Sequence, residues 1–524
     1  MSAPDQNDLL LAGKLPDDPL EGTVPSKKKS RTKLPRIPAH GIPLTDIVER
    51  AVRALERDKE VYTRAQRLVR VIRDRRPLDG VTRAAAGPTI VALVAADLRE
   101  RLTRVASWHE HPRDDNVARP PMDVVRAVLV RRVWPNLRPL EFVTETPILA
   151  PGGRIIQRRG YYPDTGVLYR PDQPYPAVPS HPTAEQVHAA ASRLLKLVVD
   201  FPFRDDVACG AWLAALLTPM ARLAFRGPSP LFLVDANLAG TGKTLLVKLT
   251  GLIATGREPA ISSYSRHDEE MRKRITALLL DGTRVVLLDN LAEGLGSPAL
   301  DALLTSSTWK DRILGKSQMT PDLPNHTTWY ATGNNVAVEG DTARRVLPIT
   351  LDSHDENPED RDDFKQPRLL EHVRQSRSQL LVDGLTLLMA ALQQPPPSLA
   401  AWGSYEGWSS VVRPAVMLAD LPDPAEARLR LRDSAQEAAD ALGHVLAWLE
   451  AHGPATAAEI LAAAETDTTL SLACTLLAPG SAGDASSNAR LGLALRRFKG
   501  RPVRGRRLGN RRTNQGQAWY VEAV

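Results

Sequence analysis

Apolar residues in the middle of the chain alternate between the spacing of helices and that of strands. The stretch EQVHAAASRLLKLVVDF has apolar residues at helical spacing and leads into PLFLVDA, a short apolar run typical of a buried parallel strand. Strand-like and helical segments then alternate to about residue 352. This alternation predicts an α/β fold built on a parallel sheet.

The preceding segment, from about residue 41 to 180, has a different pattern. EVYTRAQRLVRVIRD predicts a pair of strands, and PILAPGGRIIQRRGYYPDTGVLY predicts a hairpin that turns at Gly152 and Gly153, with a second turn at Pro163 to Gly166. These elements predict a small mixed α+β domain, or collar.

The two ends of the chain are basic. The first 40 or so residues include PSKKKSRTKLPR and lack apolar periodicity, so we expect a disordered tail, either a solvated segment or a phosphate-binding arm. Two helical stretches followed by GRPVRGRRLGNRRTNQGQAWYVEAV, a basic hairpin with glycine turns, predict a winged helix at the other end.

These patterns divide the chain into five parts. They are a basic tail (1–40), an N-terminal mixed domain (41–180), an α/β domain (181–395), a linker with a helical segment (396–434) and a winged-helix domain (435–524). The α/β domain closes with the helix RSQLLVDGLTLLMAALQQ, which ends at three prolines because proline cannot continue the hydrogen-bond ladder.

Composition narrows the class of protein. The 524 residues are 43% hydrophobic and 25% charged, as in globular proteins. The net charge of +7 indicates either a polyanionic partner such as nucleic acid or simply a solvated basic surface. Two cysteines exclude a disulfide framework or a cysteine-rich zinc site. Pro219 and Arg222 interrupt the most apolar stretch, and no secretory signal opens the chain, so we expect a cytoplasmic protein without a membrane partner.

The stretch DANLAGTGKT, which begins at Asp235, contains most of a phosphate-binding loop. Such a loop needs inward backbone N–H groups, a lysine near the β and γ phosphates and a hydroxyl on Mg²⁺. The loop lies between an apolar strand and the helical pattern TLLVKLTGLI, whose N-terminus favours phosphate. We therefore predict a site for ATP and Mg²⁺ formed by Gly240, Thr241, Gly242, Lys243 and Thr244.

Asn237 stands where the first glycine of such a loop is usual. That glycine commonly has a positive φ, and asparagine tolerates this region better than most residues. We therefore interpret Asn237 as a backbone-compatible replacement within a working loop.

Further polar residues follow later apolar strands. Asp289 lies near the end of RVVLLDN, where its carboxylate could hold Mg²⁺ through water or simply cap a buried strand. Asn334 and Asn335 end TTWYATGNN, in reach of a γ-phosphate or an attacking water. Arg344 and Arg345 follow shortly after, and an arginine offered to a neighbouring subunit's nucleotide accelerates phosphoryl transfer strongly.

The ordered set ANLAGTGKT, EEMRKRI, VVLLDN, WKDRILGKS, YATGNN and GDTARRVLPI, within about residues 185 to 352, resembles the superfamily 3 and D5-like helicases. These belong to the AAA+ ATPases and occur in replication proteins of phages, plasmids and integrated elements. The resemblance implies a P-loop AAA+ core in a hexameric ring that moves along one DNA strand.

By position, the resemblance makes Asp289 the Walker B acid. It makes Asn334 or Asn335 the polar sensor, and Arg344 or Arg345 the finger acting in trans. RILGKSQMTPD lies where these motors place a hairpin in the ring pore, so Lys316 becomes a candidate contact for single-stranded DNA, or else an exposed loop lysine.

Two features depart from the family. Many AAA+ motors have a glutamate directly after the Walker B aspartate, whereas this chain has Asn290, which can orient a water but cannot take its proton. Glu293, or a glutamate from the stretch DEE at Asp268 to Glu270, could replace it. Relatives often carry a primase domain, but residues 41–180 lack the clustered carboxylates that such a domain requires, so a separate primase is a possible partner.

Between Arg496 and Arg512 the chain is dense in arginine and has no acidic residue. Arg504, Arg506 and Arg507 are therefore candidates for contacts with duplex or forked DNA. The alternatives are a solvated surface or one that packs on acidic parts of a neighbouring subunit.

The sequence thus favours an ATP-dependent DNA helicase or translocase that acts in the replication of a phage, plasmid or other mobile element. The alternative is a DNA-binding regulator that uses ATP binding as a switch, and Asn290 keeps this alternative open.

Overall fold

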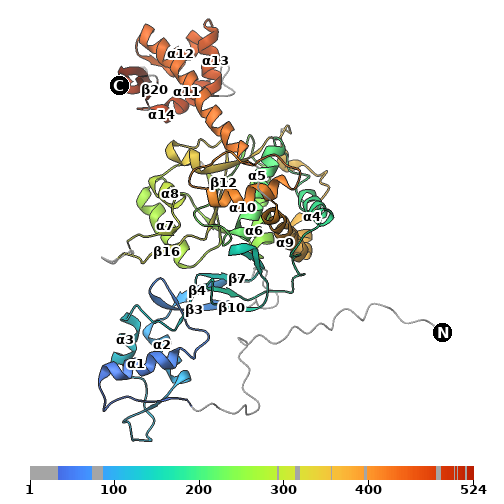
Figure 1. The fold of residues 1–524 in the computed structure, drawn as a ribbon. Helices are drawn as coiled ribbons and strands as arrows, with labels where there is room; N and C mark the ends of the chain where they lie inside the picture. The colour runs from blue at the N-terminus through green and yellow to red at the C-terminus, as the bar shows by residue number, and fades with distance from the viewer. Residues whose placement is uncertain are drawn as a thin grey trace, which may run out of the picture. The chain divides into compact units, whose positions relative to one another are not determined.

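The computed structural model describes residues 34–73, 87–291, 294–312, 319–355, 357–394, 398–478, 485–500, 502–503, 505–513 and 516–523 (Figure 1). The chain forms two compact units. One contains residues up to 61 together with 93–137, and the other contains 62–92 together with 138–524.

The first unit is a small helical body with one strand pair. Helices α1 (Leu44–Leu55), α2 (Ala95–Val105) and α3 (Met122–Val130) bury their apolar faces together. Strand β1 (Arg36–Pro38) pairs in parallel with β5 (Ser107–His109). Because β1 lies within the segment that we expected to be disordered, regular structure begins before residue 40.

Small sheets open the second unit, and they confirm the predicted strand pair and both turns. One sheet has the order β4 (Pro88–Ala92), β3 (Arg67–Arg73), β2 (Tyr62–Arg64), β6 (Arg138–Pro139). A second has the order β10 (Gly160–Tyr162), β11 (Val167–Tyr169), β7 (Phe142–Thr144), and the strands β8 (Ile148–Ala150) and β9 (Arg154–Ile156) form a hairpin. The turns need glycine, since Gly152, Gly153 and Gly166 have φ of 73°, 75° and 64°.

A five-stranded parallel sheet forms the centre of the second unit, which confirms the predicted α/β class. Its order is β13 (Ala260–Ser262), β14 (Val285–Leu291), β17 (Thr328–Asn334), β12 (Leu231–Ala236), β18 (Val346–Leu351). Helices α6 (Lys243–Thr255), α7 (Asp268–Leu280) and α8 (Pro298–Leu303) lie between these strands in sequence. Because the strands are parallel, the polar residues that end β12, β14 and β17 meet at one edge.

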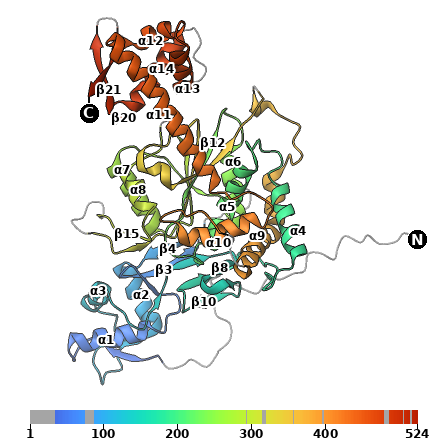
Figure 2. The ribbon, with the colours of Figure 1, turned by 45° about the horizontal axis from the view of Figure 1, so that its top comes forward.

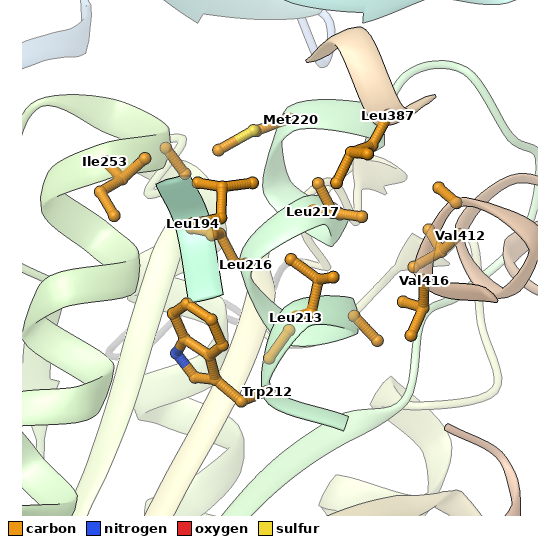
Figure 3. Packing of buried hydrophobic residues seen from close by; sticks show 14 of the residues in the cluster. Leu194, Trp212, Leu213, Leu216, Leu217, Met220, Ile253, Leu387, Val412 and Val416 are labelled. Carbon is orange, nitrogen blue, oxygen red and sulfur yellow. The ribbon is translucent and has the colours of Figure 1, made fainter. Parts of the chain in front are cut away.

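The main core lies between this sheet and a layer of helices. Helices α6, α9 (Leu369–Gln393) and α10 (Glu406–Met417) pack against α5 (Asp206–Ala221), which is buried on nearly every side, and α4 (Ala184–Lys196) packs against α9. Figure 3 shows its Trp212, Leu213, Leu216 and Leu217 among apolar side chains of the other helices. This segment is the predicted buried helix, and no described helix is long and apolar enough to cross a membrane.

The C-terminal part has a core of its own around Leu446, Ile460 and Trp519. It contains α11 (Glu426–His452), α12 (Ala457–Ala464), α13 (Thr468–Leu477), α14 (Ala485–Phe498) and an antiparallel sheet of order β19 (Ala455–Thr456), β22 (Gly516–Ala523), β21 (Arg506–Thr513), β20 (Pro502–Val503) (Figure 2). The basic hairpin is confirmed as β21 and β22. Helix α11 begins within the predicted linker and continues into the predicted winged-helix domain. It can cross this predicted boundary because no proline interrupts residues 426–452.

Candidate nucleotide-binding site

The phosphate loop joins β12 to α6, as the sequence predicts. Gly240 and Gly242 have φ of 75° and 84°, a region that side chains rarely adopt. A Cβ at Gly240 would also lie 2.4 Å from the Glu359 Oε2 atom, and one at Gly242 would lie 3.0 Å from the Phe201 ring. Both glycines are therefore required by backbone conformation and by close packing.

The reason that we gave for Asn237 is wrong, because its backbone does not adopt the positive φ that a glycine at this position commonly has. Its side chain makes long-range hydrogen bonds instead. Asn237 Nδ2 donates to Asp352 Oδ1 and to the Ser353 carbonyl oxygen, both at 2.8 Å, and Asn237 Oδ1 accepts from the Ser353 N–H at 3.1 Å. Asn237 thus ties the start of the loop to the segment after β18.

The loop lysine contacts the end of β17. Lys243 Nζ donates to Asn334 Oδ1 at 2.6 Å, to the Leu238 carbonyl oxygen at 3.0 Å and to Thr241 Oγ1 at 3.3 Å. Burial lowers the pKa of Lys243, although the nearby Asp235 and Asp289 favour its charged form. These contacts bring together the phosphate loop and the predicted sensor.

The carboxylate of Asp289 accepts hydrogen bonds from two threonines. Thr244 Oγ1 donates to Asp289 Oδ1 at 2.9 Å, and Thr332 Oγ1 donates to the same oxygen at 2.5 Å. A hydroxyl and a carboxylate are ligands that Mg²⁺ accepts together with phosphate oxygens and waters. No group of three or more His, Cys, Asp or Glu suited to a metal occurs in the described part of the chain. The donor set therefore fits Mg²⁺ bound with a nucleotide.

The asparagines directly after Asp289 and at the end of β17 have different roles in the structure. Asn290, with φ of 55°, lies at a bulge in β14, and its N–H donates to Thr332 Oγ1 at 3.0 Å. Asn335, with φ of 49°, donates from its side chain to the Asn237 carbonyl oxygen at 3.3 Å, whereas Asn334 contacts Lys243. Only Asn334 of the predicted sensor pair therefore touches the loop lysine.

Among the described residues, the predicted substitutes for the missing glutamate have other partners. Glu293 lies outside the described residues. The carboxylates of Asp268, Glu269 and Glu270 each form an ion pair with a basic residue one turn along their own helix α7.

Asp235, which sequence reasoning did not select, is a further titratable group at this edge. Its Oδ1 accepts a hydrogen bond from the Val336 N–H at 3.1 Å, so it joins the end of β12 to the turn after β17. Burial raises the pKa of this carboxyl to about 6, although the backbone hydrogen bonds and Lys243 oppose the shift. An acidic residue inside the apolar run LFLVDA was the available signal.

A cavity of about 500 Å³ adjoins the phosphate loop, and sequence reasoning also missed it. Gly240, Thr241 and Gly242 form one side, and residues from before β12 and after β18 form the others. Its walls are largely apolar, with Phe201, Pro202, Leu245, Pro358, Phe364 and Leu370, and its polar residues include Asp355, Arg361 and Gln366. Its size and its position beside the loop suit a nucleoside.

The two candidate finger arginines differ in exposure. The Arg345 side chain is only 16% exposed and pairs with Asp301 at 2.6 Å and with Asp341 at 2.8 Å. The Arg344 side chain is 73% exposed, although it also contacts Asp341. Arg344 is therefore the one available to another molecule.

The candidate DNA residues are only partly described. Lys316 and Arg504 lie outside the described residues. The segments around Lys316 are antiparallel, since Arg312 bridges Met319 and β15 (Thr308–Trp309) pairs with β16 (Leu323–Pro324), as a hairpin requires. In the C-terminal hairpin Arg506 pairs with Glu450 at 2.8 Å, and the exposed arginines are Arg507, Arg511 and Arg512.

Comparison with known proteins finds solved structures of low similarity to this chain. No protein-family model matches the chain, and no curated protein matches it. Among solved structures, the apo C-terminal region of NrS-1 is similar over 88% of this chain and 95% of that chain, with 10% identity and a TM-score of 0.36. The JCV helicase is similar over 45% of this chain and 67% of that chain, with 15% identity and a TM-score of 0.20. TM-scores this low do not establish a common fold.

The buried carboxyl of Asp235 predicts a pH-dependent stability. Its ordinary pKa is 3.8 and its folded pKa is about 6, so its contribution is fully present below pH 3.8 and is lost as pH rises through 6. The loss amounts to about 3 kcal/mol. We expect urea unfolding from pH 4 to 7 to show the wild type losing stability relative to Asp235→Asn, and a constant difference would contradict this prediction.

Proposed function

We propose that the protein is an ATP-dependent DNA helicase or translocase that acts in the replication of a phage, plasmid or other mobile element. The observation that carries the proposal is the convergence of Lys243, Thr244, Asp289 and Asn334 at the carboxyl edge of a parallel sheet. Ligands of open α/β sheets bind at this edge. The proposed architecture is a P-loop AAA+ core with an N-terminal collar and a C-terminal winged helix.

In the proposed reaction, backbone N–H groups of the phosphate loop and Lys243 bind the phosphates of ATP. To do so, Lys243 exchanges its hydrogen bond with Leu238 for phosphate oxygens. Thr244 and Asp289 would hold Mg²⁺, and a bound Mg²⁺ would supply positive charge that neutralises the phosphates. Asn334, 2.6 Å from Lys243 Nζ, orients the attacking water or contacts the γ-phosphate. The apolar cavity beside Gly242 receives the base.

The proposed assembly is a homohexameric ring in which Arg344 completes the site of the neighbouring subunit. The exposure of Arg344 supports this role, because a finger must leave its own subunit's surface. Within the ring, the hairpin that contains Lys316 contacts single-stranded DNA, and the C-terminal hairpin contacts duplex or forked DNA. Priming is supplied by a separate protein.

A regulator that switches on ATP binding is the second candidate. Asn290 favours it, because the amide next to Asp289 cannot accept the proton of an attacking water. The two candidates share the nucleotide site and differ in turnover.

ATP turnover tests the motor. We expect the purified protein to hydrolyse ATP faster when single-stranded DNA is present, and Lys243→Ala to remove turnover because it removes the phosphate-binding ammonium. A phosphate-release assay measures both rates. ATP binding without turnover, with DNA present, would favour the switch.

Mixing two inactive variants tests the finger. Arg344→Ala should keep ATP binding but lose turnover by about 1,000-fold, whereas Lys243→Ala should lose ATP binding. In mixed rings an intact nucleotide site can face an intact finger, so the mixture should hydrolyse ATP when neither variant does alone. Arg345→Ala is the matched control, because it breaks an ion pair with Asp301 within the subunit and should lower thermal stability. Failure of the mixture to recover turnover argues against a finger in trans.

DNA binding tests the basic hairpin. Arg507 and Arg511 lie on the face of β21 opposite Leu508, because alternate strand residues share a face. The double variant Arg507→Ala/Arg511→Ala should weaken binding to every DNA sequence and reduce the logarithmic salt dependence by about 2. Fluorescence anisotropy across a salt series measures this, and Arg53→Ala/Arg126→Ala removes the same charge from exposed positions elsewhere. A loss confined to one DNA sequence would exclude pure phosphate contacts.

A further inference from the structure

The segment between β18 and α9 passes over the phosphate loop. We refer to residues 352–355 and 357–368 as the strap. The strap supplies Ser353, Asp355, Pro358, Arg361 and Phe364 to the wall of the cavity beside the loop. A nucleotide that uses the loop and the cavity therefore meets the strap.

The strap is fastened at both ends. At its start, Asp352 and Ser353 are held by the side chain of Asn237. Near its end, the carboxylate of Asp200 accepts from the backbone N–H groups of Lys365 at 3.0 Å and Gln366 at 2.8 Å. These anchors lie on either side of a short 3₁₀ helix, Pro358–Asp360, so its position is set from both directions.

The 3₁₀ helix places an acidic side chain against the loop. A Cβ built on Gly240 would lie 2.4 Å from Glu359 Oε2 and 2.8 Å from the Glu359 backbone nitrogen. Gly240 is one of the residues whose backbone N–H groups would surround the phosphates. A carboxylate at this point repels the phosphates of an incoming nucleotide, and it competes with them for the positive ends of the loop dipoles.

We propose that Glu359 is an affinity-determining residue of the nucleotide site, and that the strap is a gate held shut by Asn237. The inference rests on the proposed function of the site, because it assumes that the loop binds a nucleoside triphosphate. It also assigns a role to Asn237. The residue that departs from the usual loop pattern is the one that fastens the gate.

Removal of the Glu359 charge should tighten nucleotide binding. We expect Glu359→Gln to lower the Kd for a fluorescent ATP analogue with Mg²⁺ by about 10-fold, since it removes one negative charge close to the phosphates. Glu359 and Asp362 are both exposed residues of the strap, but only Glu359 belongs to the 3₁₀ helix that approaches Gly240, so Asp362→Asn is the matched control for the loss of one negative charge. It should change the Kd by less than about 2-fold.

Release of the anchor should speed nucleotide entry. Asn237→Gly removes the side-chain hydrogen bonds to Asp352 and Ser353. It also introduces the glycine that is usual at this position of such loops. In stopped-flow mixing with the same analogue, we expect its association rate to rise several-fold. Equal rates for this variant and the wild type would overturn the gate.

Lys243→Ala distinguishes a failure of the proposed nucleotide site from a failure of the proposed role of Glu359. If the wild type binds the analogue, Lys243→Ala does not, and Glu359→Gln binds like the wild type, the nucleotide site stands and the role of Glu359 is refuted. If Asp362→Asn tightens binding as much as Glu359→Gln, the effect is one of overall charge, and the role of Glu359 is again refuted. If neither the wild type nor Glu359→Gln binds, the nucleotide site itself is refuted together with the strap.

Discussion

The carboxylate of Asp289 is the point on which the geometry of the site depends. One of its oxygens accepts from Thr244, in the first turn of α6, and from Thr332 on β17, so three segments far apart in sequence meet at one atom. The parallel sheet makes this possible, because it brings the carboxyl ends of β12, β14 and β17 to a common edge. The contact of Lys243 with Asn334 follows from the same arrangement.

Local patterns were sufficient to predict the centre of this site. The strand, loop and helix around Lys243 are contiguous in sequence, and the strands that end at Asp289 and Asn334 are short apolar runs that can be recognised one at a time. Their meeting then follows from parallel pairing alone. The core positions of α5 are equally local, since a helix that is apolar all round must be buried.

The surroundings of the loop could not be predicted in this way. Asn237 bonds to residues more than 100 positions away, and its role is set by a segment without any recognisable pattern. The same holds for the cavity. Its walls come from residues before β12, from the phosphate loop and the start of α6, and from residues after β18. Local reasoning considered only the backbone of Asn237 and therefore gave the wrong physical cause. The start of α11 was missed for a different reason. The helix runs without a break across the predicted boundary at residue 435, so no sequence signal marks that boundary.

The two departures from the usual loop and strand patterns act in the same direction. Asn290 leaves the position next to Asp289 without a group that takes a proton, and Asn237 fastens an acidic strap against the phosphate loop. Under the two proposals, the missing base would slow turnover and the strap would slow nucleotide entry, so both would restrain the site in an isolated subunit. In a ring, the neighbour's Arg344 would favour the nucleotide-bound state, and bound nucleotide would displace the strap. Under the motor proposal, ATP hydrolysis would therefore depend on ring assembly, because the site of an isolated subunit is restrained by its own residues.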